Sequence, residues 1–483
     1  MYYMKKKSCK IKLVHISDPS VYGNPLALGY IKTYTDSMLK GKVNTEIIEY
    51  LIKKVNNEIE EVAQEIVRKK PDIVAFSCYL WNVIQAINLT KEIKKRNKKI
   101  RVIFGGPDAS IRGSKILKDS GGDALVLGEG EATFVDLVQK FLHGKTWANT
   151  PGAITIVKGK ISKGPARKPI ENLDTIPSPY LTGVFDGKIY DFWVYETSRG
   201  CPFNCTFCVW TNKGAIREFS MSRAKQEVDW LIKNAKDNVN INSPQIARYV
   251  SKVFFADQDI TMQKARAVEI LSYIRDNIGT KNLMWVVECN LKYFTKEVGE
   301  AGNFSKMNFC FGIQSINYEL VKSLGRSPLT MVEMENKLEL VKNWAPKARI
   351  LLQIMLGIIG DTKKGFIATL NWCLEQCAKI QTMPVLAFHR EFSPKLSATY
   401  NSMLRTGVQI FPLSVFPNTP LEKEAKQKGA RWNKNPPYLM KGTNEFPEKD
   451  INYCYDLLKM FERFTFMMFE NHIVQISVND RVI

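Results

Sequence analysis

The sequence predicts an α/β protein with two successive domains: a doubly wound parallel sheet, then a partial (β/α)6 barrel, followed by a helical C-terminal extension. Short apolar segments alternate with helical segments over residues 11–145, and a second alternation of the same kind begins near residue 191. A chain of 483 residues is also too long for one ordinary hydrophobic core, so more than one domain is expected.

The first alternation contains candidate strands with helices between them. The strands are expected at residues 11–16, 46–50, 72–77, 100–104 and 124–127. Apolar residues at helical spacing predict helices over residues 56–69 and 83–96 and a further helix that ends at Phe141. On a parallel sheet of this kind, ligands bind at the carboxyl ends of the strands.

The second alternation predicts the barrel. Its strands are expected near residues 192–197, 252–256, 283–288, 308–313, 349–355 and 384–388. Helices are expected between them, for example over residues 223–234, 265–278 and 331–344. Six strand–helix units fit a partial barrel, whose site lies at the carboxyl ends of its strands.

The remaining segments set the domain boundaries. Residues 146–190 are rich in glycine, proline and lysine, and they predict a linker with one small hairpin near residues 153–161. The alternation stops near residue 415, and residues 450–471 form a strongly apolar candidate helix. We therefore expect four parts: domains at 1–145 and 191–415, a linker at 146–190 and an extension at 416–483.

Composition excludes several classes of protein. Ten cysteines in 483 residues do not make a secreted disulfide framework. No apolar run approaches the roughly 18–20 residues of a membrane span. The basic N-terminus lacks the apolar core of a signal peptide. These features predict a cytoplasmic protein that does not bind membranes.

The net charge of +21 raises the question of nucleic acid binding. The lysines are spread along helix-like segments and mix with acidic residues, and no long basic block follows Lys5, Lys6 and Lys7. This dispersed charge argues against RNA or DNA as a partner and favours a small-molecule or peptide substrate.

Three cysteines in one short loop carry the chemistry. Cys201, Cys205 and Cys208 have the spacing Cys-x3-Cys-x2-Cys, between a β-rich run and a helical one. Three thiolates can hold three irons of a cubane cluster and leave the fourth iron open. A structural zinc site would need a fourth ligand nearby, but the next cysteine is Cys289 and the next histidine is His389.

This loop resembles the signature of the radical S-adenosylmethionine (SAM) superfamily. There the open iron of a [4Fe-4S] cluster chelates the amino and carboxylate groups of SAM. The resemblance implies that Cys201, Cys205 and Cys208 are the cluster ligands and that Phe207 lies near the adenine. It also implies a reducing compartment and an electron donor such as flavodoxin or ferredoxin.

Polar residues stand at the ends of several barrel strands. Asp257 and Asp259 follow one strand, and Glu288 and Asn290 end the next. Each could be a site residue or an ordinary cap of the strand end. His389 ends the last predicted strand and is a candidate substrate contact; residues 390–410 and the C-terminal helix are expected to shape the substrate pocket.

The resemblance also implies SAM contacts in the barrel. The segment 311–315 looks like the family's Gly-Ile-Glu/Gln-Ser segment, which implies contacts from Gln314 and Ser315. Gln353 stands where the fifth strand of the family often carries an acid, and it is a further expected contact.

Strand ends of the first domain resemble the Rossmann-like cobalamin-binding domain. That pattern has an Asp-x-His-x-x-Gly loop, where this chain has Ser20 at the histidine position, so base-off cobalamin is implied. The segments 25–30, 78–82 and 128–131 look like those of cobalamin-dependent radical SAM enzymes. The implied cobalamin-binding residues are Ser20, Ser77, Tyr79, Leu80, Trp81, Gly105, Gly106, Gly128 and Glu129.

The combined resemblance implies a methyltransferase acting at an unactivated carbon, through a 5′-deoxyadenosyl radical and methylcobalamin. Three alternatives stay open: a cyclase or rearrangement enzyme that uses both cofactors without methyl transfer, an RNA methylthiotransferase, and a cofactor-binding sensor. A first domain that no longer binds cobalamin is also possible on the sequence alone. The sequence assigns no catalytic residue beyond the cluster ligands and does not identify the substrate.

Overall fold

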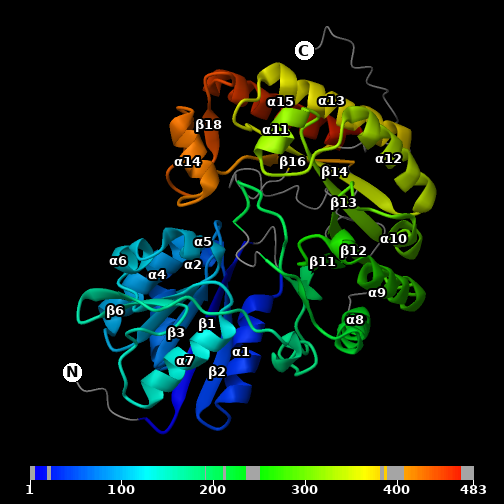
Figure 1. Cartoon of the computed structure of the whole chain (residues 1–483). Coiled ribbons are helices and arrows are strands. Elements are labelled where there is room, and N and C mark those ends of the chain that lie inside the picture. Colours follow the sequence, from blue (N-terminus) through cyan, green and yellow to red (C-terminus); the bar gives the residue numbers. More distant parts are fainter. Residues whose placement is uncertain are drawn as a thin grey trace.

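The computed structural model describes residues 6–18, 23–190, 192–209, 214–234, 251–380, 386–388 and 407–468; side chains are described in these ranges except at 386–388 and 459–468. Two seven-stranded sheets dominate these ranges, the first formed within residues 9–163 and the second within residues 192–412. Figure 1 shows the first domain in blue and cyan and the barrel in green and yellow.

The first sheet has the order β2-β1-β3-β4-β5-β6-β7. Its first five strands are parallel. They are β1 (Cys9–Ser17), β2 (Val43–Leu51), β3 (Ile73–Ser77), β4 (Arg101–Gly105) and β5 (Ala124–Val126). The two added strands are β6 (Ala153–Val157) and β7 (Lys160–Lys163), both antiparallel. The hairpin expected inside the linker therefore joins this sheet, because β6 completes the open edge of the short strand β5.

Helices cover both faces of the first sheet, which confirms the doubly wound arrangement. The helices are α1 (Leu26–Met38), α2 (Ile52–Asn57), α3 (Ile59–Arg68), α4 (Val83–Arg96), α5 (Pro107–Arg112), α6 (Lys115–Ser120) and α7 (Glu131–Leu142). Side chains of α1 and α7 pack in one apolar cluster with alternate residues of the sheet, and those of α2 to α6 pack in another. Each strand therefore buries side chains on both faces.

The second sheet is parallel throughout and has the order β15-β16-β14-β13-β12-β11-β8. Its strands are β8 (Phe192–Tyr195), β11 (Ser251–Phe255), β12 (Leu283–Cys289), β13 (Met307–Gln314), β14 (Arg349–Leu356), β15 (Leu386–Phe388) and β16 (Val408–Pro412). The predicted fold class is confirmed, but six strands were expected and β16 was missed. Polar Gln409 interrupts its short apolar run, which therefore lacks the pattern of a buried strand.

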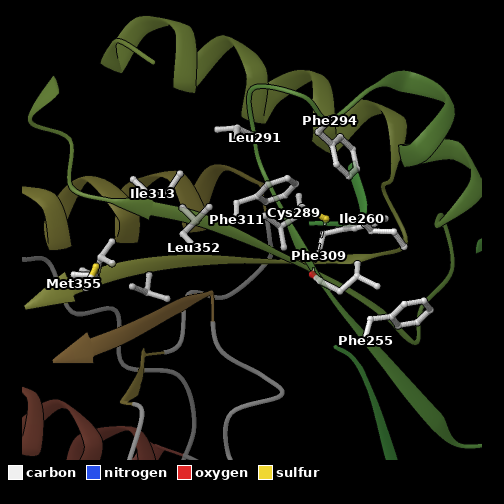
Figure 2. Packing of buried hydrophobic residues seen from close by; sticks show 14 of the residues in the cluster. Phe255, Ile260, Cys289, Leu291, Phe294, Phe309, Phe311, Ile313, Leu352 and Met355 are labelled. Atoms are coloured by element: carbon white, nitrogen blue, oxygen red, sulfur yellow. Dashed lines mark hydrogen bonds between the residues drawn. The ribbon is translucent and has the colours of Figure 1, made fainter. Parts of the chain in front are cut away.

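Helices line one face of the second sheet. They are α8 (Met221–Asn234), α9 (Lys264–Asn277), α10 (Lys296–Ala301), α11 (Tyr318–Ser323), α12 (Met331–Trp344) and α13 (Lys363–Ile380). Beneath them, the rings of Phe294, Phe309 and Phe311 pack edge to face at 4.9–5.1 Å (Figure 2). Alternate residues of each strand point to the other face, which faces away from these helices.

The C-terminal extension bridges the two domains. It contains α14 (Pro420–Gln427), β17 (Arg431–Trp432), β18 (Met440–Gly442) and α15 (Glu448–Met468). Figure 1 shows α14 near α5 and α6 of the first domain. Asn418 donates from Nδ2 to the carbonyl of Ile111 at 2.6 Å, and the Tyr438 hydroxyl lies 3.4 Å from Asp108 Oδ1. Within the described ranges, no helix has both the length and the apolar character that a membrane crossing requires.

Candidate functional site

The two domains meet at the outer strand of the barrel. Asn24 donates its backbone N–H to the carbonyl of Phe192 at 3.1 Å, and its side-chain Oδ1 accepts from Val194 N–H at 2.6 Å. Asn24 of the first domain thus provides hydrogen-bond partners for backbone groups at the open edge of β8. Because the contact begins at the N-terminus of α1, it fixes the first domain against the start of the barrel.

The cysteine loop is closed at its base by a short ladder. Strands β9 (Ser198–Arg199) and β10 (Arg217–Glu218) pair in antiparallel fashion, and Gly214 N–H donates to the carbonyl of Cys201 at 2.9 Å. Gly200 has φ +118°, and a Cβ there would lie 2.3 Å from the carbonyl oxygen of Ala215. Only glycine fits this close approach.

The far side of the loop rests on the barrel. Thr206 N–H donates to the carbonyl of Leu324 at 3.0 Å. Gly325 has φ +74°, and a Cβ there would lie 2.8 Å from the carbonyl oxygen of Asn204. The segment after β13 and α11 therefore supports the loop from below.

The three predicted cluster ligands share this loop and are half-buried. The pKa of Cys201 is raised by burial first, and the neighbouring thiols of Cys208 and Cys205 raise it further. In the described ranges no three His, Cys, Asp or Glu side chains converge as ligands of a single metal ion. A cubane takes one thiolate on each iron, so its cysteines need not converge on a point, and the donor set fits such a cluster. Phe207 packs half-buried against the barrel core.

Asp257, at the end of β11, holds the segment before the loop. Its carboxylate accepts from Thr197 N–H at 2.9 Å, from the Thr197 hydroxyl at 2.6 Å and from the Ser198 hydroxyl at 2.5 Å. Burial raises the pKa of Asp257, and these hydrogen bonds oppose that shift. Asp259 instead caps the turn η4 (Ile260–Gln263), accepting from Thr261 N–H at 3.0 Å. Both acids thus have structural roles in this state.

The predicted SAM contacts Gln314 and Ser315 lie at an irregularity of β13. The register shifts between Gly312 and Gln314, and Gln314 has φ +66°, which is strained for a residue other than glycine. A Cβ on Gly312 would lie 2.5 Å from Gln314 Nε2, so a larger residue at position 312 would displace the Gln314 side chain. Ser315 Oγ lies 3.3 Å from Thr369 Oγ1 and accepts from the N–H of the residue two positions on. Such strain is typical of functional sites.

Gln353 belongs to a polar row on the face of the sheet opposite the helices. Its Nε2 donates to Glu288 Oε1 at 3.0 Å and to Gln409 Oε1 at 3.1 Å. Burial raises the pKa of Glu288 to about 7, while the hydrogen bond from Gln353 lowers it. The structure therefore brings together three polar side chains from β12, β14 and β16; Gln409 was missed because its strand was missed.

In the first domain, the loop after β3 presents the expected aromatic residues. The rings of Tyr79 and Trp81 stack with centroids 4.6 Å apart and planes 2° from parallel. Asn82 fixes the loop: its Oδ1 accepts from Tyr79 N–H at 2.8 Å, and its Nδ2 donates to the carbonyls of Ile16 at 3.0 Å and Ser77 at 3.2 Å. Ser77, Tyr79, Leu80 and Trp81 are half-buried at this strand end.

The predicted glycines have different surroundings. Gly106 has φ +92°, and a Cβ there would lie 2.5 Å from the carbonyl oxygen of Cys78, so the protein backbone itself requires this glycine. A Cβ on Gly105 would meet only the Phe76 carbonyl oxygen, at 3.9 Å, and one on Gly128 would meet nothing within 4 Å. Among the described residues, no group hydrogen-bonds to the buried Ser17 Oγ at the end of β1. The space beside Gly105 and Gly128 and the Ser17 hydroxyl fit the nucleotide tail of a bound cobalamin.

Glu129 has protein partners. Its carboxylate accepts from Arg217 Nη1 at 3.2 Å and also pairs with Arg217 Nη2, and its Oε2 lies 3.7 Å from Arg199 Nη1. The residue expected at the cobalamin site therefore ties the first domain to the cysteine loop. Its role as a cobalamin contact stays a prediction.

Other predicted residues lie outside the described ranges. They are Ser20, His389 and the pocket residues Glu391, Lys395, Tyr400 and Arg405.

Two clefts are formed by residues that the structure describes. A small one of about 30 Å³ includes Gly312, Ser315 and Arg326 in its lining, beside the predicted SAM contacts. A larger one of about 420 Å³ lies between the first domain and the C-terminal extension, where its lining includes Arg112 and Tyr438. None of the predicted cofactor residues that the structure describes lines the larger cleft.

Comparison with known proteins bears on both domains. Residues 23–138 match the family model of the B12 binding domain. This match covers the expected strand ends of the first domain, except those before residue 23.

Several relatives in sequence are named methyltransferases, and the name of one of them includes both cobalamin and radical SAM. The cobalamin-dependent radical SAM methyltransferase TokK of Streptomyces tokunonensis is 30% identical over 233 residues, which are 45% of this chain and 33% of TokK. The chain thus spans about a third of the length of the first curated relatives it matches. Methylthiotransferases match more distantly, at 23–24% identity.

Solved structures share the fold over almost the whole chain. The radical SAM methyltransferase TsrM of Kitasatospora setae, with tryptophan and a SAM analogue bound, has a TM-score of 0.64 at 16% identity, covering 92% of this chain and 82% of TsrM. The cobalamin-dependent SAM radical enzyme OxsB, with aqua-cobalamin and SAM bound, has a TM-score of 0.67 at 14% identity, covering 94% of this chain and 67% of OxsB. These findings confirm the resemblance: the chain has a B12 binding domain and the fold of cobalamin-dependent radical SAM enzymes.

Proposed function

We propose that this chain is a cobalamin-dependent radical SAM enzyme that methylates an unactivated carbon of a small-molecule or peptide substrate. The observation that carries the proposal is the contact between two loops. The loop with Cys201, Cys205 and Cys208 and the acidic loop at residues 128–131 of the B12 binding domain are joined by ion pairs. Methyl transfer is favoured because TokK and TsrM are named methyltransferases.

The residues of the chain hold and orient the reactants. The thiolates of the cysteine loop would hold the [4Fe-4S] cluster, and Asp257 fixes the start of that loop through Thr197 and Ser198. Gln314 and Gln353 lie at the same end of the barrel and would orient SAM. When bound, the cluster, SAM and cobalamin supply hydrogen abstraction by a radical and the methyl group. Fixing reacting groups at the right distance contributes much of the rate in such sites.

The first domain would present cobalamin to the barrel. The stacked rings of Tyr79 and Trp81 offer a flat surface, and Leu80 between them in sequence adds apolar contact. The open positions at Gly105 and Gly128 leave room for the nucleotide tail. Because Tyr79, Leu80 and Trp81 offer no imidazole nitrogen to cobalt, we expect this surface to support the base-off form.

The test is anaerobic reconstitution followed by product analysis. An ultraviolet–visible spectrum after loading with iron, sulfide and hydroxocobalamin should show both the cluster and the corrin. Reduction in the presence of SAM and candidate substrates should yield 5′-deoxyadenosine and a product heavier by one methyl group. A product of unchanged or lower mass would replace methyl transfer with cyclisation or rearrangement, and absence of either chromophore would overturn the proposal.

The cysteines argue against an RNA methylthiotransferase. By resemblance, that class carries a further three-cysteine cluster in the first domain, but residues 1–145 contain only Cys9 and Cys78. Both thiols are buried, and burial raises the pKa of Cys78 well above its usual value. A low-potential cluster needs a reducing environment and an electron donor, so the proposal includes a cytoplasmic location and a flavodoxin or ferredoxin as donor.

A further inference from the structure

Charged side chains gather where the cysteine loop meets the first domain. We call this group the junction cluster. The first domain contributes Glu129 and Glu131, and the segments on either side of the cysteine loop contribute Glu196, Arg199 and Arg217. Each of these side chains is at most 14% exposed. Charges so far from water are stable only when they are paired and hydrogen-bonded.

Arg199 is the centre of the junction cluster. Its Nε donates to Glu196 Oε2 at 2.9 Å, within the barrel, and its Nη2 lies 2.9 Å from Glu131 Oε1, in the first domain. Its guanidinium carbon lies 5.0 Å from the ring centroid of Tyr30 on α1 and 5.9 Å from that of Phe219. One guanidinium thus uses its fork of donors and its flat face on both domains at once.

Arg217, at the other end of the cysteine loop, also pairs with a carboxylate of the first domain. Arg199 and Arg217 are register partners in the ladder of β9 and β10, which closes the cysteine loop. Arg217 pairs with both carboxylate oxygens of Glu129 and donates to the carbonyl of Ile170 at 2.5 Å. Both ends of the cysteine loop are therefore attached to residues 128–131.

These ion pairs couple the position of the cysteine loop to that of residues 128–131. If the cysteine loop shifted, three buried carboxylates would lose their partners, and breaking a buried ion pair on one side is strongly destabilising. Order imposed on one loop must therefore stabilise the other. Neither the resemblance nor the comparisons assign any role to Arg199.

We propose that Arg199 is a positioning residue that couples cobalamin binding in the first domain to assembly of the cluster in the cysteine loop. The inference rests on the proposed function, since it requires both groups to bind. Assembly of the cluster orders the loop between Arg199 and Arg217, and this order passes through Glu129 and Glu131 to the strand end that receives cobalamin. By thermodynamic linkage, cobalamin favours cluster binding by the same factor.

The experiment measures the affinity for hydroxocobalamin of the full-length protein with and without its cluster. The cluster-free form is prepared by anaerobic removal of iron with a chelator. We expect the wild-type protein to bind hydroxocobalamin about tenfold more tightly when the cluster is present, a typical coupling between two sites. In Arg199→Gln the ratio of the two dissociation constants should fall to about one, because the amide cannot reach both domains.

Arg223→Lys is the matched control. Arg223 is also a buried arginine, pairs with Glu227 at 3.0 Å and lies 4.1 Å from the same Phe219 ring. Among the described residues, its ion-pair, ring and hydrogen-bond partners belong neither to the first domain nor to the cysteine loop. The control should keep the wild-type ratio. A merely structural role for Arg199 would lower stability in both variants without changing the ratio.

The outcomes separate the coupling from the function itself. Tight binding of hydroxocobalamin and a normal cluster with a wild-type ratio near one would overturn the coupling and leave the proposed function intact. An unchanged ratio in folded Arg199→Gln would also overturn it, and if that variant does not fold, Glu131→Gln on the other side of the ion pair decides in the same way. Failure of the wild-type protein to bind hydroxocobalamin would overturn both proposals.

Discussion

At the scale of single residues, the candidate site depends on contacts between side chains that are far apart in the sequence. The sequence predicts Glu129, Ser315 and Gln353 as cofactor contacts. In the structure, each of these side chains interacts with a residue that is far away in the sequence. The cysteine loop could be proposed as a cluster site from the sequence because the expected ligands are close together in the chain and their spacing is typical of a cluster site. The junction cluster could not, since no local pattern pairs Arg199 with Glu131.

Replacing Cys201, Cys205 or Cys208 by alanine should abolish the cluster and the cleavage of SAM while the fold remains. Each change removes one of three thiolate ligands, and no other cysteine lies in the loop to replace it. Iron content, 5′-deoxyadenosine formation and circular dichroism test this. Cys310→Ala, at a buried thiol of β13, is the control and should keep its iron. Normal iron in any of the three loop variants would contradict the assignment.

The buried carboxyl of Glu288 predicts a pH dependence of stability. Its pKa of about 7 lies above the usual 4.5, so the folded state holds a proton that the unfolded state releases. The contribution of this carboxyl to the free energy of unfolding is therefore largest below pH 4.5 and decreases as the pH rises toward about 7. The decrease is at most about 1.4 kcal/mol for each pH unit between these two pKa values. Glu288→Gln keeps a proton-bearing group and removes this loss.

Melting temperatures of wild type and Glu288→Gln, measured from about pH 5 to about pH 8, test the sign. The variant should gain on the wild type as pH rises through this range. Glu445→Gln, at an exposed carboxylate, should run parallel to the wild type. A constant difference between wild type and Glu288→Gln would show that the Glu288 carboxyl is not protonated in the fold.

At the scale of elements, most strands and helices are visible in the sequence because apolar periodicity is local. The helices α4 and α12 lie at residues 83–96 and 331–344 as expected. The failures concern pairing: nothing local shows that β6 adds to the first sheet or that β16 inserts between β14 and β15. Strand order depends on contacts between distant segments, which a pattern along the chain does not report.

The ladder that closes the cysteine loop predicts a difference between two glycines. Gly200 and Gly214 have nearly the same φ, +118° and +116°, but a Cβ on Gly200 would overlap Ala215 whereas one on Gly214 would meet nothing within 4 Å. Gly214→Ala should therefore cost only the backbone strain, roughly 1–2 kcal/mol. Gly200→Ala should also open the ladder and lower the bound iron. Equal iron contents and melting temperatures in the two variants would contradict this.

At the scale of the whole molecule, the charge of +21 would suggest a nucleic acid partner, but its distribution does not. Many lysines of both domains have acidic partners on the surface. Such pairs include Lys6–Asp72, Lys54–Glu65, Lys69–Glu46, Lys95–Glu92, Lys225–Glu269 and Lys264–Glu297. Each pair contributes little to stability, but it interrupts any continuous track for phosphates.

We therefore expect RNA binding to be weak and to collapse as salt is raised. A protein that neutralises several phosphates loses orders of magnitude in affinity between about 50 and 200 mM salt, because the release of condensed counterions gains less entropy when the bulk salt is more concentrated. Filter binding of the full-length protein to total RNA across this range measures the effect. Retention of tight binding at the higher salt would require contacts beyond phosphates, and it would favour the RNA methylthiotransferase over the proposed function.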